Sequence, residues 1–386
     1  MASVDAMLDD KRVCICAGSG GVGKTTTSAA IAAGMAARGM KVAVLTIDPA
    51  KRLADSLGLP ELGNVEQQVD PALFEAAGIE LRGELWAMQL DAKATFDDVV
   101  AKHAPDEETR DRVLQNRIYK QISNALAGSQ EYMAMEKLFE LHAEDRYDLL
   151  VLDTPPSRNA LDFLEAPKRL TQFIEGRSLQ VFLRPTGIGM KVFGRGSAMG
   201  LSVLKRITGV DLLQDIAEFF QAFSGMVGGF RERARRVNEL LADRQTTFLV
   251  VCGPQGEPIS EAVYFHRKLV EAALPFGGVI VNKVHYLPEV DADAARLRAD
   301  LESALGDADL ADRVAANFAD HRALAERDAE NIARLKREMK ARRVIRIPYL
   351  DEDVHDLAGL AEINRYLFAS ERERVALAAG SGPVEA

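Results

Sequence analysis

The feature that most constrains this fold is a glycine-rich loop between a short apolar run and a helical segment. Residues 18–25 read G-S-G-G-V-G-K-T, which fits the phosphate-binding pattern G-x-x-x-x-G-K-[ST]. The apolar run 12–17 before the loop predicts a buried strand, and the Ala-rich stretch 25–38 after it predicts a helix. A second apolar run over 42–47 completes a strand–loop–helix–strand unit of the length that a parallel crossover needs.

The loop chemistry predicts a nucleotide phosphate site. Glycines let the backbone turn tightly and point N–H groups at an anion, and the following helix adds its positive dipole end. We expect Lys24 to reach the β- and γ-phosphates and the Thr25 hydroxyl to bind Mg²⁺. The predicted phosphate-binding residues are Gly20, Gly21, Val22, Gly23, Lys24, Thr25 and Thr26, and the predicted cofactors are ATP and Mg²⁺.

Two carboxylates follow apolar runs and are candidates for the chemistry. Asp48 ends the run beside the loop, where α/β sheets bind their ligands, so we place it near the γ-phosphate and its attacking water. The alternative is that Asp48 only caps the next turn. Asp153 ends the run 147–153, which has the form of a Walker B strand whose Asp holds the Mg²⁺ shell. The predicted catalytic residues are Asp48 and Lys24, and the predicted metal residues are Thr25, Asp48 and Asp153.

Further apolar runs predict an α/β fold of the P-loop NTPase type, with a mostly parallel twisted sheet, helices on both faces and a helical subdomain. Asn282 ends one of these runs, and its amide could read an adenine edge or simply form a turn. We expect a single domain over 12–368. Its helical insertions are expected at about 92–144, 161–244 and 288–343, with flexible termini at 1–10 and 370–386.

Composition limits the classes of partner. The net charge of −10 argues against a nucleic-acid surface, and the sequence contains no apolar run long enough for a transmembrane segment. Three cysteines give no disulfide framework, so we expect a cytoplasmic location, with membrane contact only through a partner. We expect the thiols of Cys14 and Cys16 to face opposite sides of their strand, and we predict no thiolate metal site.

The stretch 161–244 combines apolar helical faces with many glycines and several methionines. Methionine gives an adaptable apolar surface, which favours a binding surface for an apolar client. A helical layer packed on the sheet or buried in a dimer has the same periodicity, so both interpretations stay open.

Together these residues resemble the ArsA family of ATPases, which includes ATPases that deliver tail-anchored membrane proteins and groups with MinD-like and nitrogenase-iron-protein-like NTPases. Within that family the chain resembles single-unit, anion-transporting ATPase homologues of actinobacterial type. The resemblance adds Asn282 and Pro348 as nucleotide-binding residues. The resemblance to the family rests on five features: the P-loop 18–25, Asp48-Pro49-Ala50, Asp153-Thr154-Pro155-Pro156, Val281-Asn282 and Ile347-Pro348-Tyr349-Leu350.

The resemblance implies an ATP-hydrolysing dimer in which two subunits close face to face on their nucleotides. Because this chain carries one unit, the second ATPase subunit must be another chain, either in a homodimer or in a paralogous heterodimer. The expected client is apolar or a membrane protein, bound through 161–244.

The chain departs from the family at several positions. Ser19 stands where the family has a signature lysine, and serine supplies no cation to the charge that develops in phosphoryl transfer. Lys51 and Ser157-Arg158-Asn159 replace the family's histidine and Thr-Gly-His turn. The alternative function is therefore a nucleotide-gated binding subunit with little hydrolysis of its own. A MinD-like membrane switch is disfavoured because we find no basic amphipathic helix at the C-terminus.

Overall fold

One eight-stranded sheet is the centre of the computed structural model. The structure describes residues 3–48, 50–117, 119–120, 130–154, 219, 226–286, 294–350, 354 and 356–378. The strands are β1 (Val13–Ala17), β2 (Lys41–Thr46), β3 (Gln67–Gln68), β4 (Glu84–Gln89), β5 (Leu149–Asp153), β6 (Thr246–Cys252), β7 (Phe276–Val284) and β8 (Val344–Pro348). Their order is β3-β4-β2-β5-β1-β6-β7-β8, and all neighbours are parallel except β3 and β4.

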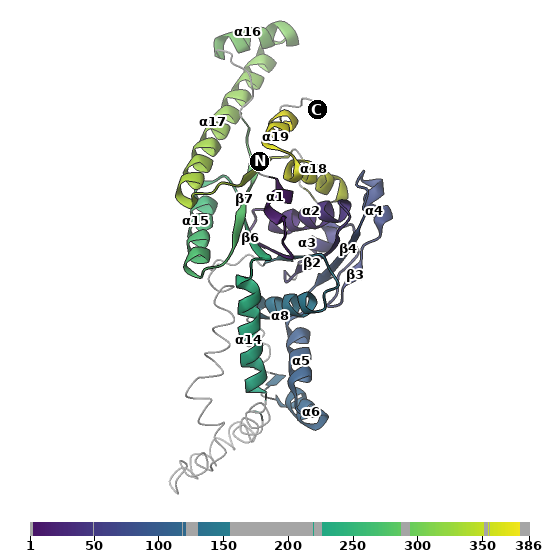
Figure 1. Cartoon of the computed structure of the whole chain (residues 1–386). Coiled ribbons are helices and arrows are strands. Elements are labelled where there is room, and N and C mark those ends of the chain that lie inside the picture. The colour runs from purple at the N-terminus through teal and green to yellow at the C-terminus, as the bar shows by residue number, and fades with distance from the viewer. Residues whose placement is uncertain are drawn as a thin grey trace, which may run out of the picture.

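Helices cover both faces of the sheet, as Figure 1 shows. One apolar cluster packs against α1 (Val4–Leu8), α2 (Lys24–Ala37), α3 (Arg52–Ser56), α4 (Pro71–Ala76) and α18 (Leu357–Phe368). The other packs against α5 (Ala92–His103), α6 (Glu107–Gln115), α8 (Gln130–Ala143), α14 (Val227–Ala242), α15 (Gly256–Glu271) and α17 (Ala308–Met339). The predicted fold class, a mostly parallel sheet with helices on both faces, is therefore confirmed.

The central strands are buried on both faces, which explains why their sequences are continuous apolar runs without polar alternation. Within β1, Val13 and Ile15 join one cluster and Cys14 and Cys16 join the other. The expectation that the two cysteines face opposite sides was wrong, because residues two apart in a strand share a face. Cys252 lies in the opposite cluster. In the described part of the chain, no three His, Cys, Asp or Glu side chains are grouped to hold a metal ion.

The termini also differ from expectation. Residues 1–10 were expected to be flexible, but α1 begins after the cap Ser3 and its Val4, Met7 and Leu8 are buried in the core. The apolar spacing of this one-turn helix is sufficient to anchor it despite the acidic residues around it. At the other end, α19 (Glu371–Ala378) occupies part of the segment expected to be frayed, and 379–386 lie outside the described residues.

All three expected helical insertions are only partly described, since residues 118 and 121–129 of the insertion 92–144 also lie outside the described residues. Most of 161–244, including the predicted client surface, lies outside the described residues, apart from Phe219 and the segment that contains α14. In the region 288–343, α16 (Ala294–Leu305) packs against the long helix α17, and this pair projects from the sheet in Figure 1. No helix among the described residues is long and apolar enough to cross a membrane.

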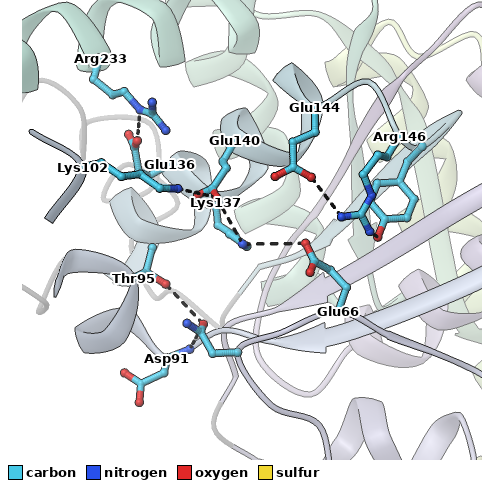
Figure 2. Close-up of polar contacts among 12 residues, drawn as sticks. Glu66, Asp91, Thr95, Lys102, Glu136, Lys137, Glu140, Glu144, Arg146 and Arg233 are labelled. Atoms are coloured by element: carbon cyan, nitrogen blue, oxygen red, sulfur yellow. Dashed lines mark hydrogen bonds and ion pairs between the residues drawn. The ribbon is translucent and has the colours of Figure 1, made fainter. Parts of the chain in front are cut away.

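A polar network links three helices in the lower part of Figure 1, α5, α8 and α14, to one another and to the sheet edge at β3 (Figure 2). Lys102 of α5 bonds Glu140 of α8 at 2.6 Å. Lys137 of α8 lies 3.8 Å from Glu66, which precedes β3. On α14, Arg233 pairs with Glu136 of α8, whose side chain is fully buried. These contacts fix α5, α8 and α14 as one layer under the sheet.

A candidate nucleotide-binding site at the P-loop

The loop between β1 and α2 has the backbone that its glycines predict. Gly21 and Gly23 adopt φ values of 74° and 89°, which are left-handed conformations that side chains with a Cβ avoid. A Cβ on Gly23 would also lie only 2.4 Å from the amide nitrogen of Asn282. Gly23 is the N-cap of α2, so the N–H groups of the loop lie at the positive N-terminal end of that helix.

A cavity of about 450 Å³ opens in front of this helix end, at the carboxyl ends of the strands. Most of the residues predicted to bind nucleotide or catalyse line it: Gly21, Gly23, Lys24, Thr25, Thr26, Asp48, Asn282 and Pro348. Gly20, Val22 and Asp153 do not line it. Gly20 is exposed, Val22 packs in the core and Asp153 is fully buried.

Hydroxyl groups connect the P-loop to the carboxylate of Asp153 and to the backbone of Asp48. Thr25 Oγ1 donates to Asp153 Oδ2 at 2.8 Å, and Thr46 Oγ1 donates to the same oxygen at 2.9 Å. Thr46 Oγ1 in turn accepts the backbone N–H of Asp48 at 3.2 Å. The register of the parallel pair β2–β5 places Thr46 directly beside Asp153, so the sheet itself aligns these groups.

Asp153 is poised to hold a cation. Its Oδ1 is buried and has no hydrogen-bond partner among the described residues. Burial raises its pKa to about 6, although the Thr25 and Thr46 hydroxyls and the charge of Lys24 act to lower it. A buried carboxylate with one unused oxygen beside a threonine hydroxyl is the oxygen donor set that Mg²⁺ prefers, so these residues fit that ion.

Lys24 points into the loop. Its Nζ donates to the carbonyl oxygen of Ser19 at 2.7 Å, and the residue is only 6% exposed. Burial lowers the pKa of Lys24, and the nearby carboxylates of Asp153 and Asp48 oppose that shift. An anion entering the cavity would therefore meet a desolvated ammonium group whose charge it would stabilise.

Asp48 is bound on both carboxylate oxygens. Oδ1 accepts the backbone N–H of Ala50 at 3.0 Å, and Oδ2 lies 3.3 Å from a guanidinium nitrogen of Arg52. The side chain therefore holds the following turn while it lines the cavity, so the two roles considered for Asp48 do not exclude each other.

Asn282 lies at the carboxyl end of β7 and bonds to the P-loop. Its amide nitrogen donates to the carbonyl oxygen of Val22 at 3.0 Å, and its oxygen accepts the backbone N–H of Lys283 at 2.9 Å. Both ends of the amide are thus engaged within the protein, and contact with an adenine edge stays a prediction.

Ser19, at the position where the family has a lysine, donates its hydroxyl to Glu261 of α15. Sequence reasoning missed three other functional candidates, namely Thr46, Arg52 and Lys283. Arg52 and Lys283 line the cavity, and the Thr46 hydroxyl bridges the Asp153 carboxylate and the backbone N–H of Asp48. The signal that could have found them is position, because all three lie within four residues of a predicted site residue at a strand end.

Comparison with known proteins gives one family over most of the chain. The model of the anion-transporting ATPase family matches residues 11–325. ATPase GET3A of Arabidopsis thaliana is 25% identical over 301 residues, covering 77% of this chain and 74% of its own. ATPase GET3 of Podospora anserina is 24% identical over 283 residues, covering 73% and 75%. A putative arsenical pump-driving ATPase of Aquifex aeolicus is 25% identical over 287 residues, covering 73% and 82%.

Proposed function

The chain belongs to the anion-transporting ATPase family and is an ATPase of the ArsA type, and from this premise we propose that the P-loop cavity is its hydrolytic site. The observation that carries the proposal is the bonded series Thr25–Asp153–Thr46–Asp48 beside Lys24. Family membership favours this function over a nucleotide-gated subunit that does not hydrolyse ATP.

Each residue has a proposed role. Backbone N–H groups of residues 20–24 and the ammonium group of Lys24 bind the phosphates. Asp48 orients the attacking water. Thr25 and Asp153 would hold Mg²⁺, which when bound neutralises phosphate charge. The orphaned Oδ1 of Asp153 supports this assignment, since desolvating a carboxylate oxygen without a partner is costly.

Two variants test the site. Lys24→Ala should abolish MgATP binding, measured by calorimetry. Asp48→Asn should bind MgATP but hydrolyse it at least about a hundredfold more slowly, because the water loses its orienting carboxylate. Lys51→Ala, an exposed neighbour on the same turn, is the matched control. Full binding by the first variant, or full turnover by the second, would remove that residue from its role.

We also propose that the active form contains a second ATPase subunit, as a homodimer or a paralogous heterodimer. The support is the family resemblance together with the single P-loop of this chain. Specific ATPase activity that rises with protein concentration and then saturates would indicate a homodimer. Activity that stays constant from nanomolar to micromolar concentration would contradict it.

The remaining assignments are also proposals. One domain over 12–368 is supported by the single sheet that takes strands from Val13 to Pro348. An apolar or membrane-protein client handled through 161–244 rests on the composition of that segment and on the family resemblance. A cytoplasmic location, with membrane contact through a partner and no nucleic-acid partner, rests on the charge and the cysteine usage.

A further inference from the structure

The nucleotide cavity contains a cation whose function is unassigned, Arg52. It is the first residue of α3 and lines the cavity together with Lys24, Thr25 and Asp48. Its guanidinium lies 3.3 Å from Asp48 Oδ2, and its charge is close enough to influence the pKa of Lys24. Arg52 is therefore on the side of the cavity where the terminal phosphate of a nucleotide would lie.

The other two lining cations are placed differently. The Lys24 ammonium group donates to the Ser19 carbonyl oxygen inside the loop, a position from which it would bind the phosphates of ATP before the reaction begins. Lys283 adjoins Asn282 on β7, where the predicted base contacts and Pro348 are. Among the described lining cations, Arg52 alone combines a position beside Asp48 with a largely exposed side chain, of which 64% is accessible to solvent.

The adjacent loop position supplies no cation. Ser19 carries a neutral hydroxyl, and that hydroxyl is bonded to Glu261 rather than directed at the phosphates. Phosphoryl transfer spreads negative charge over the oxygens of the transferred group, and a guanidinium that meets this charge accelerates the reaction strongly. The planar fork of arginine suits a phosphate with two adjacent oxygens.

We propose that Arg52 is a catalytic residue that contacts the γ-phosphate in the same chain and stabilises its charge during hydrolysis. In the structure the guanidinium of Arg52 pairs with Asp48, and the γ-phosphate of a bound ATP would be a more highly charged partner for it. Its transfer to the phosphate releases Asp48 Oδ2, which can then accept a hydrogen bond from the attacking water. The inference rests on the proposed function of the cavity.

The step balances as ordinary hydrolysis. The water oxygen forms a bond to the γ-phosphorus while the bond from that phosphorus to the β,γ-bridging oxygen breaks. ADP leaves with the bonding electron pair, and the protons of the water pass to inorganic phosphate and solvent. Arg52 neither donates nor accepts a proton in this step.

The experiment compares Arg52→Gln, Arg52→Lys and the control Lys51→Gln in the full chain with MgATP. We expect Arg52→Gln to lower kcat about a hundredfold or more while the dissociation constant for MgATP changes far less. Arg52→Lys should be intermediate, because lysine keeps the charge but not the fork. Lys51→Gln should keep wild-type kcat. The wild type should also trap MgADP with aluminium fluoride, a mimic of the transferring phosphoryl group, and Arg52→Gln should not.

Several results would overturn the inference. An Arg52→Gln variant with wild-type kcat, or one whose MgATP affinity falls as much as its kcat, would show that Arg52 is not a transition-state group. Recovery of turnover on mixing Arg52→Gln with Asp48→Asn subunits would place Arg52 on the partner's nucleotide. Absence of any MgATP binding by the wild type would instead refute the proposed function itself.

Discussion

Replacing Asp153 by asparagine tests the buried carboxylate at the centre of the site. The structure places Asp153 Oδ2 between the hydroxyls of Thr25 and Thr46 and leaves Oδ1 buried without a partner. Asparagine keeps a carbonyl oxygen for the two hydroxyls and removes the charge. The variant should therefore fold normally, lose its response to Mg²⁺ and be more stable than the wild type in the absence of ligands at alkaline pH.

The magnitude follows from the pKa. Burial raises the pKa of Asp153 from its ordinary value of 3.8 to about 6, so the folded state binds this proton more tightly than the unfolded state. Stability from this group is fully present below pH 3.8 and is lost as the pH rises through 6. Above that pH the charged form costs about 3 kcal/mol, at roughly 1.4 kcal/mol for each pKa unit.

The assay is urea unfolding at pH 5, 6.5 and 8 in the presence of a chelator. The free energy of unfolding of Asp153→Asn should exceed that of the wild type by about 3 kcal/mol at pH 8, and the difference should shrink at pH 5. The control is Asp148→Asn, which removes the carboxylate of an exposed residue directly before β5, the strand that ends at Asp153. Equal stability of Asp153→Asn and wild type at pH 8 would refute a desolvated charge at this position. The unfolding is then repeated with Mg²⁺ in place of the chelator. A gain in the free energy of unfolding from Mg²⁺ that equals the gain of the wild type would refute the role of Asp153 in holding the ion.

Three further predictions concern the supports of the site. In calorimetry, Gly23→Ala should weaken MgATP binding more than Gly21→Ala. Both substitutions strain the backbone, but only a Cβ at position 23 would lie 2.4 Å from Asn282. Equal losses of MgATP affinity would contradict this prediction. Asn282→Ala should reduce both ATP affinity and the unfolding temperature, since it frees the Val22 carbonyl oxygen and the Lys283 N–H; loss of affinity alone would indicate a pure base contact. Arg233→Met should lower the free energy of unfolding in urea at pH 8 by about 3 to 5 kcal/mol, because it leaves the buried Glu136 carboxylate without a cationic partner. The control Arg235→Met, which removes an exposed ion pair, should have little effect. Equal effects of the two substitutions would refute the structural role of the buried pair.

The sequence predicted the nucleotide side of this fold well, because the chemistry there is local. Glycine spacing, apolar runs and the carboxylates after them are all contiguous signals, and parallel strands bring their carboxyl ends to one edge. That rule alone is sufficient to place Asp48, Asp153 and Asn282 near the P-loop. The two-residue strand β3 gave no such signal, since a pair of glutamines has neither apolar character nor β propensity.

The sequence did not predict which side chains would pair with one another. The pairing of Arg52 with Asp48 depends on how soon α3 begins after β2, and the bond from Thr46 to Asp153 depends on strand register. Neither quantity is encoded in a short pattern. The error over Cys14 and Cys16 was of another kind, because strand periodicity alone places both on one face.

Asn282 shows why the carboxyl end of a strand predicts a ligand neighbourhood but not a ligand contact. Reading a base edge needs one donor and one acceptor from the amide, yet here the oxygen is bonded to the Lys283 N–H and the nitrogen to Val22. One amide hydrogen and one lone pair of the amide oxygen remain for a base, so paired recognition would add to the contacts with Val22 and Lys283. Because the same amide restrains the P-loop through Val22, any rotation of Asn282 toward the base would also alter the loop that holds the phosphates. The two ends of the nucleotide are in this way linked through one side chain.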